Sequence, residues 1–245
     1  MRDAWRLAVG TLTAVPVRAP GRVDRGTAGL AMTLAPFAVL PLAALVALVV
    51  WAGGRVELSP LGVAVVAVGA LALGTRALHL DGLADTADGL TASYDRERSL
   101  AVMRSGTVGP AGVAVIVLVL AAQVAGLTTL VASERGWLTA GVLVCVSRAV
   151  LVVLCTSGVP GARADGLGAT FVGSVPRVVA GIVMVLAAVG CGLVAGVAGL
   201  VGFAAAAVAI AALLLRVVRR LGGVTGDVFG AAVEITLAVL LLGVA

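Results

Sequence analysis

Long apolar segments separated by shorter polar stretches dominate the pattern of hydrophobic and polar positions along this chain. The apolar segments lie at about residues 28–51, 61–78, 109–132, 137–156, 178–195, 199–215 and 228–245. Each has roughly 17 to 25 residues, the length that an α-helix needs to cross about 30 Å of hydrocarbon. The pattern therefore predicts an all-α, polytopic integral membrane protein with about seven transmembrane helices.

One uncharged apolar region, residues 178–215, is too long for a single span. As one helix it would measure about 57 Å, nearly twice the thickness of the hydrocarbon layer. We therefore expect two helices joined by a tight, glycine-containing turn near residues 196–199. The whole chain, 1–245, is then a single transmembrane helical domain.

Composition agrees with this prediction, because 61% of the residues are hydrophobic and only 12% are charged. The cysteines Cys145, Cys155 and Cys191 lie in apolar stretches without the spacing of a metal site. We expect them to be inert, buried thiols.

The basic residues, all 17 of them arginine, indicate the orientation of the chain in the membrane. With the N-terminus inside, the tail and the loops 79–108, 157–177 and 216–227 share one face. That face carries fourteen arginines: Arg2, Arg6, Arg18, Arg22, Arg25, Arg76, Arg96, Arg98, Arg104, Arg163, Arg177, Arg216, Arg219 and Arg220. The opposite face carries Arg55 and Arg135. This asymmetry predicts a cytoplasmic N-terminus, with the long polar loops on the cytoplasmic side of the membrane. The net charge of +5 then reflects topology, so we expect the lipid bilayer and no nucleic acid as a partner.

The stretch HLDGLADTADGL, residues 79–90, places three acids at the cytoplasmic end of a predicted span. Asp81, Asp85 and Asp88 follow the spacing i, i+4, i+7 and would share one face of a helix. Like charges stacked in this way repel, and a divalent cation removes the conflict. Mg²⁺ binds carboxylate oxygens, waters and substrate phosphates, so the spacing favours a metal–diphosphate site. The alternative is a solvated acidic loop. His79, the only histidine, would point away from these acids and is interpreted as structural.

Two arginines are candidates for phosphate contacts, because each adjoins a glycine-rich stretch. Arg104 precedes SGTVGPAG, and Arg163 lies within PGARADGLGATF. Guanidinium groups beside glycine-rich turns suit phosphate recognition. The alternative for both is the ordinary positive charge of a cytoplasmic loop.

The last polar stretch, RRLGGVTGDVFGAAVEIT, contains Asp227 and Glu234 on one helical face. Glu234 and Arg148 both lie inside predicted spans, about 10 Å below the same surface. Ionisable residues inside spans are functional candidates. Their matched depth predicts a possible buried pair between Arg148 and Glu234, with snorkelling of Arg148 as the alternative.

These motifs resemble those of the adenosylcobinamide-GDP ribazoletransferases, also called cobalamin synthases. The matching stretches are LTAVPV, HLDGLADTADGL, MRSGTVGPAG, PGARADGLGATF and LGGVTGDVFGAAVE, in the family's order from about residue 11 to 236. The resemblance implies an enzyme of late cobalamin synthesis that uses Mg²⁺. It would lie in the bacterial cytoplasmic (inner) membrane, with its active-site loops on the cytoplasmic side. Such an enzyme joins adenosylcobinamide-GDP to alpha-ribazole, or its 5'-phosphate, and releases GMP by phosphoryl transfer.

The resemblance also implies roles for individual residues. Asp81, Asp85 and Asp88 would hold Mg²⁺. Asp81, Asp85 and Asp227 would be catalytic, with Asp227 either completing the metal shell or accepting the proton of the nucleophile. Arg104 and Arg163 would contact substrate phosphates. One departure is that the family's M-K-D-S-R-I-G pattern has Ser105 and Thr107 here in place of its Asp and Arg, so these two positions receive no catalytic role.

Three other functions compete with this interpretation. DGLAD loosely resembles the signature of CDP-alcohol-type membrane phosphotransferases, but the remaining AR and final DxxxD elements are missing. A transporter would place its ionisable site near the middle of the membrane between repeated halves, and no repeat is evident. A scaffold protein leaves the three stacked carboxylates unexplained. The sequence does not specify an oligomeric state.

Overall fold

The computed structural model describes residues 1–56, 58–163 and 167–245. The chain forms helices throughout: α1 (Arg2–Leu12), α2 (Arg25–Thr33), α3 (Ala35–Ala38), α4 (Leu40–Arg55), α5 (Pro60–Gly74), α6 (Leu78–Ala92), α7 (Arg96–Val102), α8 (Pro110–Val131), α9 (Gly136–Leu154), α10 (Leu167–Phe171), α11 (Arg177–Leu221) and α12 (Gly226–Gly243). In the described residues, β-pairing is limited to the isolated bridges Thr156–Val175 and Gly161–Val224. The predicted all-α class is confirmed.

Four helices, α8, α9, α11 and α12, are long and apolar enough to cross a membrane. If the bent pair α5 and α6 is counted as one further span, the structure has up to five spans. The prediction of a polytopic membrane fold is therefore confirmed, whereas seven spans and a cytoplasmic N-terminus stay predictions.

The first predicted span, 28–51, is divided among three helices. Pro36 lies in the first turn of α3, and Pro41 lies in the first turn of α4. Proline has no backbone N–H and is tolerated at the start of a helix but not in its interior, so each proline marks a break. α4 is consequently shorter than a full span.

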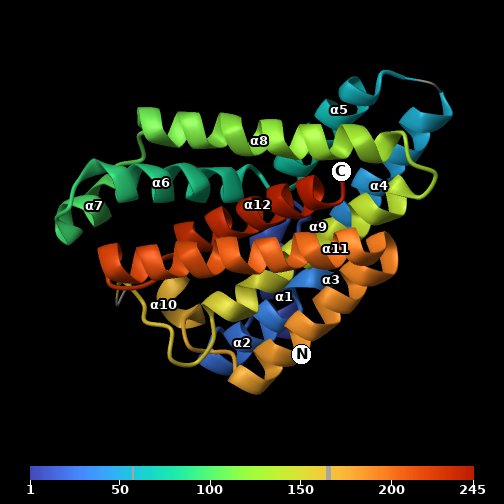
Figure 1. Ribbon diagram of the computed structural model, residues 1–245. Coiled ribbons are helices and arrows are strands. Elements are labelled where there is room, and N and C mark those ends of the chain that lie inside the picture. Colours follow the sequence, from blue (N-terminus) through green and yellow to red (C-terminus); the bar gives the residue numbers. More distant parts are fainter. Residues whose placement is uncertain (57, 164–166) are drawn as a thin grey trace.

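The long helix α11 reverses direction at Gly196, as the ribbon in Figure 1 shows. Gly196 has φ 57° and ψ −137°, a backbone conformation that favours glycine. A Cβ on Gly199 would lie 2.2 Å from the Cys191 carbonyl oxygen, so the reversal also requires a glycine there. The predicted turn near residues 196–199 is confirmed.

A sharp bend of 88° separates α5 from α6 and sets the direction of the acid-bearing helix. Arg76 and Ala77 make the bend with left-handed φ angles of 57° and 54°. This conformation costs roughly 1–2 kcal/mol for each non-glycine residue. The Arg76 side chain donates from Nη2 to the Gly10 carbonyl at 2.7 Å, which ties the bend to α1.

Helix α12 lies at the centre and packs against α6, α8, α9 and α11 (Figure 1). Glycines allow the close approach of α6 and α12. A Cβ on Gly82 would lie 2.6 Å from the Asp227 carbonyl oxygen, and one on Gly230 would lie 2.8 Å from that of His79. Small residues at crossings let membrane helices approach closely. This crossing brings the acidic motif of α6 beside the start of α12.

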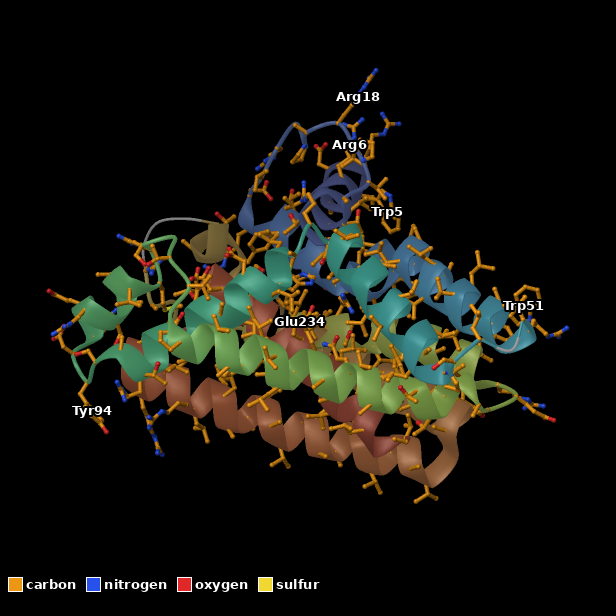
Figure 2. All side chains as sticks on the ribbon, turned by 90° about the horizontal axis from the view of Figure 1, so that it is seen from above. Trp5, Arg6, Arg18, Trp51, Tyr94 and Glu234 are labelled. Atoms are coloured by element: carbon orange, nitrogen blue, oxygen red, sulfur yellow. The ribbon has the colours of Figure 1, made fainter. Side chains whose placement is uncertain are left out.

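The two ends of the molecule are marked by aromatic residues. Figure 2 shows Tyr94 at one end, Trp51 at the other, and Glu234 between them. Each ring adjoins an arginine: the Arg220 guanidinium lies 4.5 Å from the Tyr94 ring centroid, and that of Arg55 lies 5.2 Å from that of Trp51. Aromatic and basic residues at both ends are typical of a protein that spans a membrane.

Candidate active site

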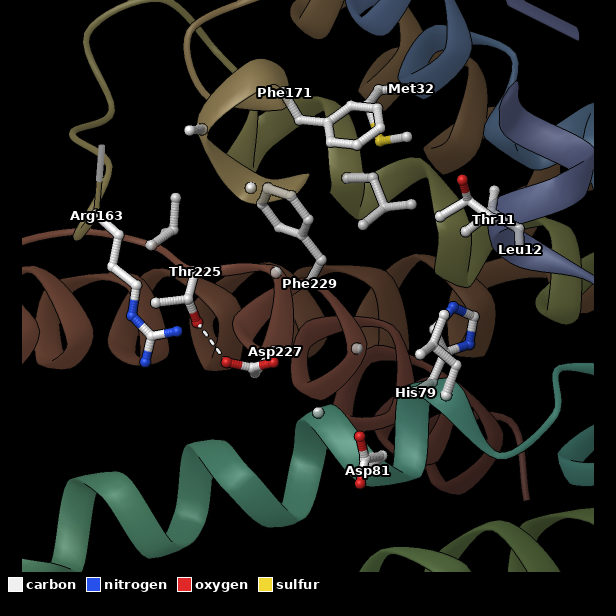
Figure 3. A pocket seen from close by; sticks show the side chains of 18 residues that line it. Thr11, Leu12, Met32, His79, Asp81, Arg163, Phe171, Thr225, Asp227 and Phe229 are labelled. Atoms are coloured by element: carbon white, nitrogen blue, oxygen red, sulfur yellow. Dashed lines mark hydrogen bonds between the residues drawn. The ribbon is translucent and has the colours of Figure 1, made fainter. Parts of the chain in front are cut away.

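A cavity of about 290 Å³ lies where α6 and α12 meet α1, α10 and the loop before α10. Asp81, Arg163 and Asp227 come to this cavity from three separate segments (Figure 3). The structure thus brings together three of the predicted site residues. His79 also lines the cavity, although the sequence suggested only a structural role for it.

The acids of α6 are arranged along the side of the helix that the sequence predicted. Asp81 is exposed, and Asp85 is partly buried one turn further along. Asp85 experiences the negative charges of Asp227, Asp81 and Asp88, opposed by the positive charge of Arg163. Carboxylates gathered in this way repel one another, so the cluster favours a cation.

Asp227 is held in the first turn of α12, directly after the helix cap Thr225. The Thr225 hydroxyl donates to Oδ2 of Asp227 at 3.1 Å. The N-terminus of a helix carries partial positive charge, which stabilises a carboxylate in this position. The position of Asp227 opposite the acids of α6 follows from the Gly82 crossing described above.

Arg163 is positioned by a loop that is bonded to the start of α12. Ala162 donates its N–H to Val224 at 2.9 Å, and Val224 donates its own to Pro160 at 2.9 Å. Nη2 of Arg163 donates to the Leu100 carbonyl at 2.8 Å. These bonds hold the guanidinium at the cavity wall. The neighbouring Asp165 of the same motif lies outside the described residues.

Asp88 has a different environment from Asp81 and Asp85. Its Oδ2 accepts the Gly109 N–H at 2.7 Å, and its Oδ1 accepts the Gly112 N–H at 2.9 Å. Asp88 is buried and caps the start of α8. Asp81 and Asp88 are seven positions apart, about 10 Å along the helix, so a shared face does not bring both to one cavity. Both carboxylate oxygens of this predicted metal ligand are thus occupied by backbone donors.

No three His, Cys, Asp or Glu side chains in the described part of the chain come close enough to enclose a metal ion by themselves. A closed protein cage, as in a structural zinc site, is therefore not found among those residues.

Arg104, the second predicted phosphate contact, is exposed on the turn that follows α7. It is not among the residues that line the cavity. The preceding helix α7 is capped by Asp95, whose Oδ1 accepts the Arg98 N–H at 2.8 Å. Arg96 has a structural role that was not predicted. It donates hydrogen bonds from Nε to the Leu221 carbonyl and from Nη2 to the Ala162 carbonyl, both at 2.8 Å. Its charge alone gave no signal of this role.

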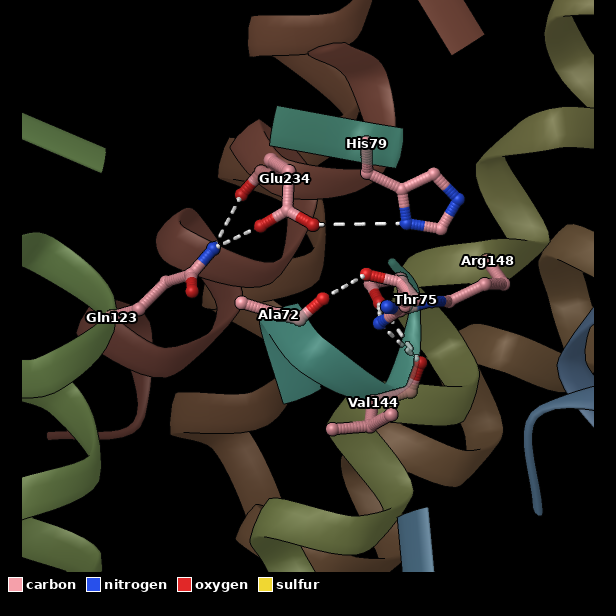
Figure 4. A network of polar contacts seen from close by, with 8 residues as sticks. Ala72, Thr75, His79, Gln123, Val144, Arg148 and Glu234 are labelled. Carbon is pink, nitrogen blue, oxygen red and sulfur yellow. Dashed lines mark hydrogen bonds and ion pairs between the residues drawn. The ribbon is translucent and has the colours of Figure 1, made fainter. Parts of the chain in front are cut away.

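A buried polar network lies beside the cavity (Figure 4). Glu234 accepts a hydrogen bond at 2.7 Å from Nε2 of Gln123, and its Oε1 lies 3.7 Å from Nδ1 of His79. Arg148, fully buried, donates from Nη1 to the Val144 carbonyl at 3.1 Å and to the Ser147 hydroxyl at 2.8 Å.

The structure does not show a direct salt bridge between Arg148 and Glu234, but the two buried charges attract each other at longer range, as their matched depth suggested. Glu234 lies beside His79, whose Nδ1 would form an ion pair with it only when protonated. Depth fixes only the level of a residue in the membrane, whereas pairing also depends on the side of the helix from which it projects. The sequence gave no sign of Gln123, a neutral residue in the interior of α8.

Comparison with known proteins identifies the family. The model of the cobalamin-5-phosphate synthase family matches residues 4–245. A protein of a Nocardioides species is 58% identical over 243 residues, covering 99% of this chain and 98% of the relative. A Frankia casuarinae protein is 40% identical, with 97% and 92% covered, and one from Pseudomonas entomophila is 36% identical, with 100% and 99% covered.

All three relatives are named adenosylcobinamide-GDP ribazoletransferase. No solved structure matches this chain. These matches favour the resemblance noted in the sequence over a CDP-alcohol phosphotransferase, a transporter or a scaffold. The chain belongs to the cobalamin-5-phosphate synthase family.

Proposed function

We propose that this chain joins adenosylcobinamide-GDP to alpha-ribazole, or to alpha-ribazole 5'-phosphate, with release of GMP. The observation that carries the proposal is the meeting of Asp81, Asp227 and Arg163 at one cavity, in a chain of this family. An acidic cluster beside an arginine suits a diphosphate, whose charge must be neutralised for transfer.

The reaction is a displacement at phosphorus. A ribose hydroxyl of the acceptor forms a new O–P bond at the phosphorus that carries cobinamide. The bond from this phosphorus to the oxygen shared with GMP breaks, and GMP leaves with the electron pair. We assign Asp227, fixed by Thr225, to accept the proton of the attacking hydroxyl. Positioning and charge neutralisation supply most of the rate in chemistry of this kind.

Asp81 and Asp85 are proposed to hold Mg²⁺. Asp81 lines the cavity, and Asp85 lies one turn beyond the lining residues, close enough to experience the charges of Asp81 and Asp227. Their carboxylates are the donor type that Mg²⁺ prefers, and Mg²⁺ usually takes one or two protein carboxylates together with waters and substrate phosphates. Two carboxylates that leave room for waters and phosphates match this coordination. Asp88 instead accepts hydrogen bonds from the start of α8. When bound, the ion would neutralise charge on the diphosphate.

Arg163 is the proposed phosphate contact from the protein. A guanidinium has five N–H donors, so its bond to Leu100 is compatible with additional bonds to phosphate oxygens. Arg104 is not retained in this role, because it does not line the cavity.

The proposed location is the bacterial inner membrane, with the cavity opening toward the cytoplasm. The asymmetric distribution of arginines supports this orientation. Both proposed substrates are phosphorylated or nucleoside compounds, and a cytoplasmic opening gives access to them without transport.

The experiment that tests the proposal uses the purified full-length protein in liposomes. GMP release from adenosylcobinamide-GDP is followed by chromatography, with and without Mg²⁺ and with and without alpha-ribazole. The proposal predicts release only when both are present, with one corrinoid product formed per GMP. Release of GMP without acceptor, or no release under any condition, contradicts it.

A further inference from the structure

The cavity has two chemically different ends. Asp81, Asp227 and Arg163 form the polar end, which the proposed function uses. The opposite end is apolar and is lined by Leu12, Met32, Leu151, Phe171 and Phe229. Figure 3 shows Met32 and Phe171 on the far side of the cavity from Asp81, with Phe229 between Phe171 and Asp227. The phosphate chemistry described above does not involve this apolar end.

Two phenylalanines give the apolar end a fixed shape. The rings of Phe171, from α10, and Phe229, from α12, lie 6.3 Å apart between centroids at 85°, an edge-to-face contact. Phe171 is buried, and Phe229 is partly exposed to the cavity. Edge-to-face pairs are a favoured arrangement of aromatic rings, so this wall is formed without a ligand.

Glycine brings these two elements together. A Cβ on Gly168 would lie 2.9 Å from the Gly226 backbone nitrogen, so α10 reaches the start of α12 only because residue 168 has no side chain. The same contact places the aromatic wall next to Asp227. A small molecule whose apolar group contacts this wall can therefore also reach the polar end.

The size of the cavity decides between the two proposed substrates. At about 290 Å³ it is at the small end of the range for small-molecule sites. A corrin macrocycle with its amide side chains is far larger than this and has a polar rim. A ribazole is a ribose attached to a flat, apolar, two-ring base that carries two methyl groups, and it matches a small cavity with one apolar and one polar end.

We infer that Met32, Phe171 and Phe229 form the binding site for the base of the nucleoside acceptor. The ribose then lies toward Asp227 and Arg163, and the corrinoid stays outside the cavity. This inference rests on the proposed function and adds to it the part of the site that selects the acceptor. The three side chains determine acceptor specificity and take no part in the chemistry.

The test compares Phe171→Leu and Phe229→Leu with Phe37→Leu, a matched control that lies outside this cavity. The variants shrink the aromatic wall while keeping it apolar. We expect the KM for alpha-ribazole to rise on the order of tenfold in the first two variants, with the KM for adenosylcobinamide-GDP unchanged. The control should retain the wild-type value of both.

Two further measurements keep the inference testable if a variant is unstable. Wild-type protein should have a KM roughly tenfold higher for the riboside of unmethylated benzimidazole. Met32→Phe, which reduces the cavity, should reverse that preference. Equilibrium dialysis of labelled alpha-ribazole with the wild-type protein, without donor, should show binding that Phe229→Leu weakens.

Each outcome has a separate meaning. If the wild-type protein transfers ribazole but neither its KM nor its binding responds to Phe171→Leu or Phe229→Leu, the base lies elsewhere and the inference is wrong. A rise in the KM for the donor alone places the corrinoid or guanosine there and equally overturns it. If the wild-type protein binds alpha-ribazole at this wall but releases no GMP, the proposed function fails and the binding site stands.

Discussion

The cap that Asp88 forms on α8 predicts that neighbouring acids of one motif respond oppositely to mutation. Asp88→Ala removes two hydrogen bonds to backbone N–H groups, at 2.7 and 2.9 Å, from a buried carboxylate. A hydrogen bond to a charged group contributes about 1.5–3 kcal/mol, so the two together give a loss of about 3–6 kcal/mol in the free energy of unfolding. Asp81→Ala removes an exposed, repelled carboxylate and should leave stability unchanged or slightly higher.

The glycines at the cap provide an independent check. A Cβ on Gly112 would lie 2.5 Å from Oδ2 of Asp88, so Gly112→Ala should displace the carboxylate and destabilise the protein in the same direction. Gly69→Ala is the matched control, because a Cβ there meets nothing within 4 Å. Alanine also favours the helix at that position by up to about 1 kcal/mol.

The assay is thermal unfolding of the full chain in mild detergent. A loss of about 3–6 kcal/mol corresponds to a fall in Tm on the order of 10 °C for a protein of this size. Asp88→Ala and Gly112→Ala should show this fall, and Asp81→Ala and Gly69→Ala should not. Equal Tm values for Asp88→Ala and Asp81→Ala would refute the capping role and return Asp88 to the candidates for metal binding.

Further predictions concern the buried network and the orientation. In double-mutant cycles of stability, Gln123→Leu with Glu234→Gln should show coupling on the order of 1 kcal/mol; strict additivity would contradict the hydrogen bond between these two side chains. A cysteine at the exposed Ala92 should react with an impermeant thiol reagent only after the membrane is opened, and labelling of intact cells would invert the proposed orientation. Asp227→Asn should lower kcat by at least about 100-fold with at most a small fall in Tm from the lost attraction to the helix N-terminus, whereas normal turnover would remove its role as a base.

Much of the fold was predictable because the length of an apolar segment and the positions of glycines within it are local properties of the sequence. The reversal of α11 at Gly196 and the ends of α8, α9 and α12 follow from them. The division of residues 28–51 was missed because Pro36 and Pro41 stand among apolar residues, where hydrophobicity alone indicates one continuous span. The 88° bend was missed because Arg76 and Ala77 are not residue types that favour left-handed backbone.

The site was predictable in its chemistry and less so in its geometry. Carboxylates and an arginine beside glycines indicated phosphate chemistry, and Asp81, Asp227 and Arg163 do meet at one cavity. Helical spacing grouped Asp88 with Asp81, but spacing on one helix contains no information about the neighbouring α8, whose N–H groups bind Asp88.

The apolar wall could not be predicted from the sequence for the same reason. Phe171 and Phe229 come from distant segments, and each alone is an ordinary hydrophobic residue.

The most direct test of the central claim is GMP release by Asp81→Asn and Asp85→Asn, each compared with Asp95→Asn, at several Mg²⁺ concentrations in liposomes. Asp95 is the matched control, because its carboxylate caps α7 and it belongs neither to the cavity lining nor to the acidic cluster around Asp85. The account predicts that Asp81→Asn and Asp85→Asn insert and fold but lose GMP release by about 100-fold or more at low Mg²⁺, since each removes a proposed ligand of the ion. Asp95→Asn should keep wild-type turnover and Mg²⁺ dependence. Wild-type turnover by either α6 variant at low Mg²⁺ would contradict the assignment of these acids to the metal and the diphosphate.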